Sequence, residues 1–285
     1  MQLTHTRLLE NHADNDDQII TLWLHGRSPA TVRLYARDAA DLVAKCGQLR
    51  SITLGALQAW ADNLPGADKS RGVHLAAARS LLSFAYRLGY TSFNVGAAMR
   101  AIRSKQTLTE RILQESDVLR MLALEEHPRN RALLYLLYDT GARVSEVLAL
   151  RWCDIHEDGD WTTVTLVGKG LRTRHSHLTA TTHALIDALR PSEGANDEPV
   201  FESRQQHRAI SVMTAERIVR AAAVRAGIDA PASPHWLRHA HATHALRHGA
   251  DIKEVADQLG HASIVTTATY LHVAIGQSTS RFLNI

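Results

Sequence analysis

The stretch PHWLRHAHATHALRHGADIKEVADQLGHASIVTTATY, residues 234–270, organises this chain. His235 and Arg238 are three residues apart, so a helix places them on one face, one turn from each other. The guanidinium of Arg238 is a planar fork of donors that can hold two phosphate oxygens, and an imidazole can move a proton near neutral pH. His261 and Tyr270 follow in the same stretch. These side chains predict phosphoryl transfer with a phenol nucleophile, which requires a second cation and a general acid elsewhere in the chain.

The second half of this stretch is predicted to form two helices joined by a turn. Apolar residues between Asp251 and Leu259 recur at helical spacing, and the Gly260 that follows is typical of a left-handed helix stop. His261 falls in that turn. Ser263 is a candidate cap for a last short helix, which would carry the tyrosine at its far end.

Size and composition favour a packed protein of one large or two ordinary domains. The chain has 285 residues, and 45% of them are apolar. The two cysteines, Cys46 and Cys153, lie far apart, which fits a reducing compartment and excludes a cysteine-based zinc site. No apolar run reaches membrane-spanning length, and the N-terminus has no signal-peptide pattern. We therefore expect a cytoplasmic protein with no membrane partner.

Positive charge is concentrated in the N-terminal part. Residues 1–105 contain 13 Lys and Arg against 8 Asp and Glu, whereas the remaining residues contain 19 against 21. This distribution is a modest indication of a polyanionic partner.

The N-terminal part is predicted to be a small bundle of helices. Ser28 and Pro29 form a helix start signal, and no strand-like alternation occurs before residue 100. Arg33 and Arg37 share one helix face, which is either solvated or in contact with phosphates. The basic linker at residues 100–111 marks a domain boundary. The candidate DNA-binding residues of this part are Arg33, Arg37, Arg71, Arg79, Arg103 and Lys105.

A second cation is available in TGARVSEVLALRWCDI, residues 140–155. Gly141 breaks the preceding buried helix, and Arg143 stands at the start of the next helix with Glu146 one turn later. The free N–H groups of a helix N-terminus favour a bound anion beside Arg143. The alternative is that Arg143 only pairs with Glu146 at the surface.

A β-hairpin follows, in which WTTVTLV (residues 161–167) and RTRHSHL (residues 172–178) are the strands. Gly168, Lys169 and Gly170 form the turn, so a lysine lies at the hairpin tip. A lysine there either keeps the turn soluble or delivers an ammonium group to a buried phosphate.

Four blocks of this chain resemble the active-site blocks of the tyrosine recombinases, the Xer-like and phage-integrase-like site-specific DNA recombinases. They are TGARVSEVLALRWCDI, VGKGLRTR, HWLRHAHATH and LGHASIVTTATYLHV, in the order and spacing of that family. The resemblance implies a mainly α fold. Residues 1–104 are similar in architecture to a helical core-binding (SAM-like) domain. Residues 105–285 are expected to form a mostly α catalytic domain with a small antiparallel β-sheet.

The resemblance also implies a mechanism that needs no metal, ATP or other cofactor. Tyr270 attacks a DNA phosphodiester and leaves a 3′-phosphotyrosine and a free 5′-hydroxyl. Arg143 and Arg238 hold the non-bridging oxygens. The remaining roles are protonation of the leaving 5′-oxygen by Lys169, proton transfer by His235, a hydrogen bond to the phosphate from His261, and orientation by Glu146.

Double-stranded DNA is the implied partner, bound by a homotetramer or by a heterotetramer with a related recombinase. Two alternatives remain for the function. One is DNA relaxation like that of a type IB topoisomerase, which shares the active-site residues. The other is a catalytically silent DNA-binding protein of the same fold.

The run HAHATH offers a competing interpretation as a metal site. His239 lies four residues after His235, and His241 and His244 follow closely, a spacing that can bind zinc on a helix. However, the glutamate of an HExxH motif is missing. We therefore expect no metal, and we expect the additional histidines to lie on the helix surface or to face a partner.

Overall fold

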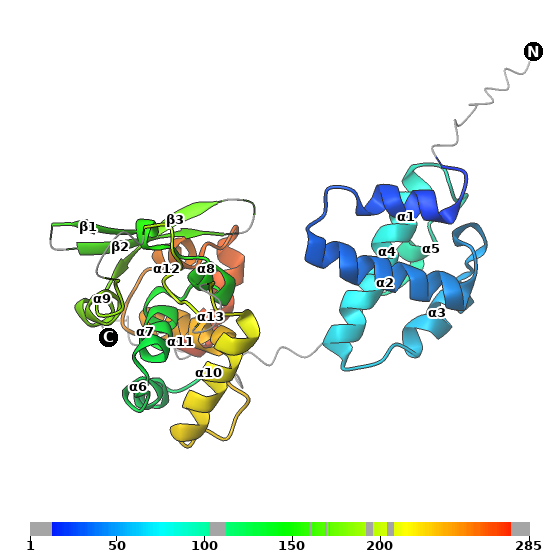
Figure 1. The fold of residues 1–285 in the computed structure, drawn as a ribbon. Helices are drawn as coiled ribbons and strands as arrows, with labels where there is room; N and C mark the ends of the chain where they lie inside the picture. The colour runs from blue at the N-terminus through cyan, green and yellow to red at the C-terminus, as the bar shows by residue number, and fades with distance from the viewer. Residues whose placement is uncertain are drawn as a thin grey trace, which may run out of the picture. The chain divides into compact units, whose positions relative to one another are not determined.

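The computed structural model of the chain describes residues 13–102, 112–159, 161–168, 170, 172–191, 196–203 and 208–274. The chain divides into two compact units, residues 1–106 and residues 107–285. Both units are mainly helical, and a small sheet belongs to the second (Figure 1), which confirms the predicted fold class. Within the described ranges, every helix is too short or too polar to cross a membrane.

The first unit is a bundle of helices around one core. Helix α2 (Pro29–Cys46) begins where the sequence predicts, and the Ser28 side chain accepts a hydrogen bond from the backbone N–H of Thr31. Its apolar face packs against α4 (Asp68–Arg87). The other elements are α1 (Asp16–Leu24), the 3-10 helix η1 (Leu49–Ser51), α3 (Leu54–Asp62) and α5 (Val95–Ala98).

The second unit contains the sheet and the remaining helices (Figure 1). Its early elements are α6 (Glu115–Ala123), α7 (Pro128–Thr140), α8 (Val144–Leu148), η3 (Trp152–Asp154), β1 (Ile155–Asp158), β2 (Trp161–Val167) and β3 (Thr173–Leu178). The later elements are α9 (Ala180–Asp187), α10 (Val212–Arg225), α11 (Pro234–Arg247), α12 (Ile252–Leu259) and α13 (Ile264–Ala274).

The sheet has three antiparallel strands in the order β1-β2-β3. The sequence predicts the β2–β3 hairpin, whose register pairs Val167 with Thr173, but it does not predict β1. Strand β1 reads IHED, which has neither the β-branched content nor the apolar alternation that indicates a strand. In β2, Val164 and Leu166 are fully buried, so one face of the sheet covers the core.

Helix α11 connects the core to the last two helices. It packs against α7, α12 and α13. Leu237 and Ala240 join the main core of this unit. Residues further along α11 join a smaller cluster, which consists of Ala242, Leu246, Val255, Leu259 and Tyr270. The predicted nucleophile is therefore packed into the apolar contact between α11, α12 and α13.

Candidate active site

Arg238 is the most deeply buried cation of the site, with 2% of its surface exposed. Its Nη1 donates to the carbonyl of Gly141 at 2.7 Å, and its Nη2 donates to the carbonyl of Leu259 at 2.7 Å. These carbonyls lie at the C-terminal ends of α7 and α12, where helices carry partial negative charge. Burial, together with the smaller effect of the nearby charge of Arg143, lowers the pKa of Arg238 to about 10. The guanidinium remains charged at neutral pH and is fixed by two helix ends.

Gly141 and Gly260 make this anchoring possible, because each ends a helix in the left-handed conformation. Their φ angles are 58° and 65°. A Cβ atom at Gly141 would lie 2.6 Å from Cδ2 of His241 and 2.9 Å from Cδ2 of Leu259. Both positions match the turn signals of the sequence. The close approach of α11 also requires a residue without a Cβ atom at position 141.

Arg143 stands at the N-cap of α8, as the sequence predicts. Its Nη1 donates to Oε1 of Glu146 at 2.9 Å, and its backbone N–H donates to Oε2 of the same carboxylate at 2.9 Å. The Arg143 side chain is 43% exposed, whereas Glu146 is only 3% exposed. The ion pair of the alternative interpretation therefore exists, but its carboxylate lies inside the protein rather than at the surface.

Arg174 is a second partner of Glu146 and is not among the predicted site residues. Its Nη2 lies 2.6 Å from Oε2 of Glu146, and its Nε donates to the carbonyl of Gln258 at 2.8 Å. Burial acts to raise the pKa of Glu146, but hydrogen bonds from Arg174 and Arg143 outweigh it and the pKa lies below its ordinary value. The sequence does contain a signal for it, because Arg174 lies in the hairpin VGKGLRTR, close to the tip lysine.

His261 follows Gly260 in the turn between α12 and α13. Its Nδ1 is 2.7 Å from Oγ1 of Thr267. Burial lowers the pKa of His261 to about 4, with further contributions from the charges of Arg238, Arg143 and Arg174. The imidazole is therefore neutral at neutral pH in the free protein, although a bound phosphate would favour its protonation.

Tyr270 lies on α13 and is 4% exposed. Its hydroxyl oxygen is 2.7 Å from Nδ1 of His239. Burial raises the pKa of Tyr270, and the charge of Arg238 acts in the opposite direction. The phenol is therefore close to the buried guanidinium of Arg238 and hydrogen-bonded to the imidazole of His239.

Two of the additional histidines of HAHATH are buried, so the prediction that they lie on the helix surface or face a partner is wrong for these two. His239 is 7% exposed and His244 is 2% exposed. His244 is held through Nδ1 by the Tyr138 hydroxyl at 2.9 Å and through Nε2 by the Leu113 carbonyl at 3.1 Å. Only the packing of α11 against α7 and α13 shows that these positions of the helix face inward.

A pocket of about 680 Å³ opens beside the site. Among its lining residues are Arg143, Gly168, Gly170, Arg172, Arg174 and His261. Lys169 lies outside the described residues, but both of its glycine neighbours line the pocket. The pocket thus has a basic lining beside the turn that carries this lysine in the sequence.

Five of the six predicted catalytic residues lie close enough together to interact electrostatically. They are Arg143, His235, Arg238, His261 and Tyr270. The charges of Arg143, Arg238 and His235 all act on His261, and Tyr270 and Arg143 both act on Arg238. His235 is exposed at the first turn of α11, and its ring centroid lies 4.0 Å from that of His239. This convergence could bind an oxyanion beside a phenol.

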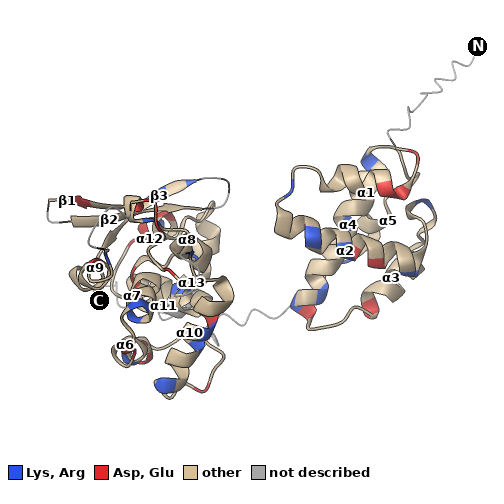
Figure 2. Cartoon of the chain, in the orientation of Figure 1, with Lys and Arg blue, Asp and Glu red and all other residues tan. Residues whose placement is uncertain are grey.

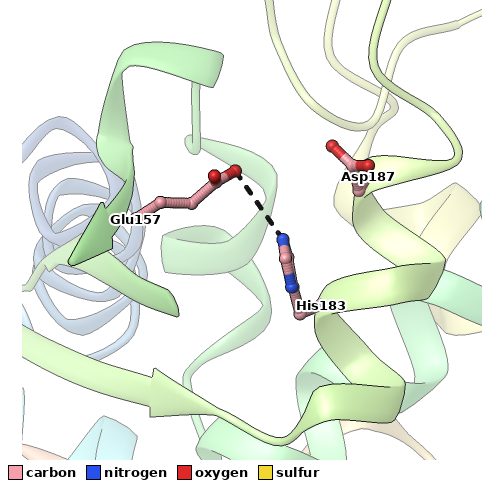
Figure 3. A group of neighbouring side chains, drawn as sticks. All are labelled: Glu157, His183 and Asp187. Carbon is pink, nitrogen blue, oxygen red and sulfur yellow. Dashed lines mark ion pairs between the residues drawn. The ribbon is translucent and has the colours of Figure 1, made fainter. Parts of the chain in front are cut away.

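Among the described residues, one group has the composition of a metal site, but it lies elsewhere (Figure 3). Glu157, His183 and Asp187 offer ligand atoms within 4.8 Å of one another. Arg190 pairs with Glu157 at 3.7 Å and with Asp187 at 3.3 Å, so both carboxylates already have a cationic partner. We interpret this group as a surface ion-pair cluster.

The candidate DNA-binding residues of the first unit differ in their surroundings. Arg33 and Arg37 are exposed on α2. Arg71 donates to the carbonyls of Ala61 and Asp62, and Arg79 donates to the carbonyl of Gly96. Figure 2 shows Lys and Arg residues of this unit interspersed with Asp and Glu residues. Arg103 and Lys105 lie outside the described residues. DNA contact by all six remains a prediction.

Comparison with known proteins gives a consistent result. The sequence profile of the Phage integrase family matches residues 111–276. Tyrosine recombinase XerC of Xylella fastidiosa (strain 9a5c) is 31% identical over 261 residues, which cover 87% of this chain and 87% of the relative. Tyrosine recombinase XerD of Chlorobaculum tepidum is 34% identical over 233 residues, 68% of this chain and 75% of the relative.

Solved structures show a similar fold. The pre-cleavage complex of XerH site-specific recombinase bound to difH substrate matches with a TM-score of 0.70 at 20% identity, over 95% of this chain and 84% of that chain. A lambda integrase (75-356) dimer bound to a COC' core site matches with a TM-score of 0.74 at 20% identity, over 92% of this chain and 95% of that chain.

Proposed function

This chain belongs to the phage integrase family and is a tyrosine recombinase that cleaves and rejoins DNA strands, and from this premise we propose that Tyr270 is its nucleophile. The observation that carries the proposal is the position of the phenol. Tyr270 is close enough to Arg238 for the guanidinium charge to act on the pKa of the phenol, and Arg143 is close enough to Arg238 to lower the pKa of that guanidinium. A phosphodiester beside Arg143 would therefore meet two guanidiniums and a phenol.

The reaction proceeds by exchange of one phosphorus–oxygen bond for another. The Tyr270 oxygen attacks the phosphorus while its proton passes to a neighbouring imidazole, the bond to the 5′-oxygen breaks, and Lys169 donates a proton to that oxygen. The products are a 3′-phosphotyrosine and a free 5′-hydroxyl. Attack by a 5′-hydroxyl of another strand reverses the step and needs no ATP, because the phosphotyrosine retains the bond energy.

Arg143 and Arg238 stabilise the charge on the five-coordinate phosphorus, the role that metal ions have in many phosphoryl-transfer enzymes. Arg238 is held in advance by two carbonyls, so little reorganisation is required when the substrate binds. Arg143 and Arg174 share Glu146, which orients both guanidiniums. His261 contributes a hydrogen bond to the phosphate, and His235 assists proton transfer from its position beside the ring of His239.

A covalent-capture experiment tests this assignment. The protein is incubated with nicked duplexes of randomised sequence in the presence of a chelator. Cleavage beside the nick releases a short fragment that carries the free 5′-hydroxyl. The loss of this fragment prevents religation and traps the covalent complex. We expect a covalent adduct whose peptide contains Tyr270, and sequencing of the attached DNA gives the recognised site. Tyr270→Phe should form no adduct, and an adduct with this variant would refute the role of Tyr270.

Double-stranded DNA is the substrate, and we propose that the first unit is a core-binding domain that contacts it through the exposed Arg33 and Arg37. Each lost phosphate contact should reduce the slope of log affinity against log salt by about one. Arg33→Ala and Arg37→Ala should therefore flatten the salt dependence of DNA binding. Arg87→Ala, at an exposed arginine at the end of α4, is the control and should leave the slope unchanged.

We further propose that cytoplasmic copies of the chain assemble as a tetramer on two duplexes, either alone or with a related recombinase. The proposal is supported by relatives of the same fold, among them a lambda integrase tetramer bound to a Holliday junction. The mass of the complex on a four-way junction checks it. Four copies per junction without any added protein would indicate a homotetramer.

A further inference from the structure

The hydrogen bond between Tyr270 and His239 is not explained by the six residues that the family resemblance assigns. His239 is the residue directly after Arg238 on α11, and its Nδ1 lies 2.7 Å from the Tyr270 hydroxyl oxygen. We propose that His239 is the proton acceptor for Tyr270 and takes the phenolic proton as the oxygen attacks phosphorus. This inference rests on the proposed nucleophilic role of Tyr270.

The need for an acceptor follows from the surroundings of the phenol. A phenol is a weak nucleophile until it loses its proton. Tyr270 is 4% exposed, and burial raises its pKa further. Bulk water therefore has little access to the hydroxyl, so the proton has to pass to a neighbouring protein group.

His239 has the geometry of that group. A distance of 2.7 Å is within the range at which a general base acts. The imidazole is 7% exposed, and the ring of His235 packs edge-on against it at a centroid distance of 4.0 Å. The ring is thus confined between Tyr270 and His235, and its Nδ1 stays directed at the phenol.

The proton balance is complete without a further reactant. With its own proton on Nε2, His239 accepts the phenolic proton at Nδ1 while the bond from Tyr270 to phosphorus forms. The bond from phosphorus to the 5′-oxygen breaks, and the general acid supplies the proton of the new 5′-hydroxyl. During religation Tyr270 is the leaving group, and protonated His239 returns the proton to its oxygen.

His239→Asn tests the proposal, because asparagine can keep a hydrogen bond to the phenol but cannot accept its proton. We expect adduct formation on a nicked duplex to slow by about 100-fold, the usual contribution of general-base catalysis. Replacement of Tyr270 by 3,5-difluorotyrosine lowers the phenol pKa and should restore most of the lost rate. An unaffected rate, or a slow rate without rescue, would overturn the proposal.

His244→Asn is the matched control. His244 is also a buried histidine of α11, but its nitrogens bond to Tyr138 and Leu113. A loss of rate in this variant comes from altered packing, so difluorotyrosine at position 270 should not rescue it. Equal rescue of both variants would show that the fluorinated phenol is merely more reactive, and would overturn the role of His239.

A second measurement retains His239 and so does not depend on the folding of a variant. The rate of adduct formation is measured against pH with tyrosine and with difluorotyrosine at position 270. Among the described residues, Arg238 acts on the phenol directly, and His235, His261, Arg143, Arg174 and Glu146 belong to the groups whose charges interact around Arg238 and His261. They are the same in both proteins.

If His239 accepts the proton, the loss of rate at low pH reflects protonation of an imidazole. The pH at which the rate falls then stays the same when the phenol is fluorinated. A fall in rate that moves to lower pH in step with the phenol would show direct ionisation of Tyr270 and contradict the proposal. Failure of the proposed function itself is distinguishable, because Tyr270→Phe would then still form an adduct.

Discussion

Two sides of the active site hold guanidinium groups by different means. On the buried side, Arg238 is 2% exposed and is fixed by the carbonyls of Gly141 and Leu259. On the open side, Arg143 has a side chain that is 43% exposed, lines the pocket and is held by the carboxylate of Glu146. A buried cation anchored by helix ends is part of the fold, whereas an exposed cation anchored by one carboxylate can turn toward a substrate. The same residue type is therefore expected to respond differently to mutation on the two sides.

The largest effect is expected from Arg238→Lys. An ammonium group cannot reach both carbonyls in the geometry of the guanidinium fork, so one buried acceptor loses its partner. We expect adduct formation to fall by about 10²–10³-fold. The free energy of unfolding should fall by about 1–3 kcal/mol. Adduct kinetics on a nicked duplex and urea unfolding measure the two effects.

Arg143→Lys is the matched variant on the open side. We expect a comparable loss of adduct formation, but an unfolding free energy within about 0.5 kcal/mol of the parent, because the side chain is substantially exposed. Equal destabilisation by the two lysine variants would remove the distinction between the buried and the open side.

Glu146→Gln should have the next largest effect, because the buried carboxylate of Glu146 holds Arg143, the cation of the open side. The carboxylate is 3% exposed and pairs with both Arg143 and Arg174. Loss of one partner from a buried ion pair typically costs about 3 kcal/mol. Glu157→Gln, at a carboxylate that is 59% exposed and paired with Arg190, should cost less than about 1 kcal/mol. Urea unfolding compares the two, and similar costs would mean that burial does not strengthen the Glu146 network.

Gly141→Ala tests the helix end that supports the buried side. The left-handed conformation and the contact of 2.6 Å with His241 should together destabilise the protein by about 2 kcal/mol. Gly159→Ala is the control, because Gly159 also has a φ of 58° but a Cβ there would meet no atom within 4 Å. It should cost only about 1 kcal/mol, the strain of the backbone alone. Thermal unfolding with equal losses in both variants would rule out the close approach of α11.

A pH-dependent effect is expected from the titration of His261. Its pKa is about 4 in the folded protein against an ordinary value of 6.5, so the unfolded chain binds the extra proton between these values. The contribution of His261 to stability is therefore complete above about pH 6.5 and is lost as the pH falls toward about 4. In melting curves between pH 7 and pH 4, the parent should lose more stability than His261→Gln. A constant difference between the two proteins would contradict the lowered pKa.

Local signals account for the parts of the structure that the sequence predicts. The Ser28 cap, the turn glycines and the β2–β3 hairpin depend on residues that are close in the chain. Strand β1 is not predictable from the sequence, because its four residues lack a strand pattern and it forms by pairing with β2. The sequence predicts His239 on the helix surface or facing a partner, because a histidine within an amphipathic helix gives no indication of its direction.

The sequence by itself determined the helical fold, the helix ends and the set of residues available for phosphoryl transfer, since each depends on residue type and local spacing. Only the tertiary structure decided which of these side chains bond to each other. Arg238 reaches a carbonyl 97 residues away, Arg174 pairs with a carboxylate 28 residues away, and Tyr270 bonds to His239 across 31 residues. Such pairs depend on the packing of α7, α11, α12, α13 and β3 against one another, and no short stretch of sequence contains that information.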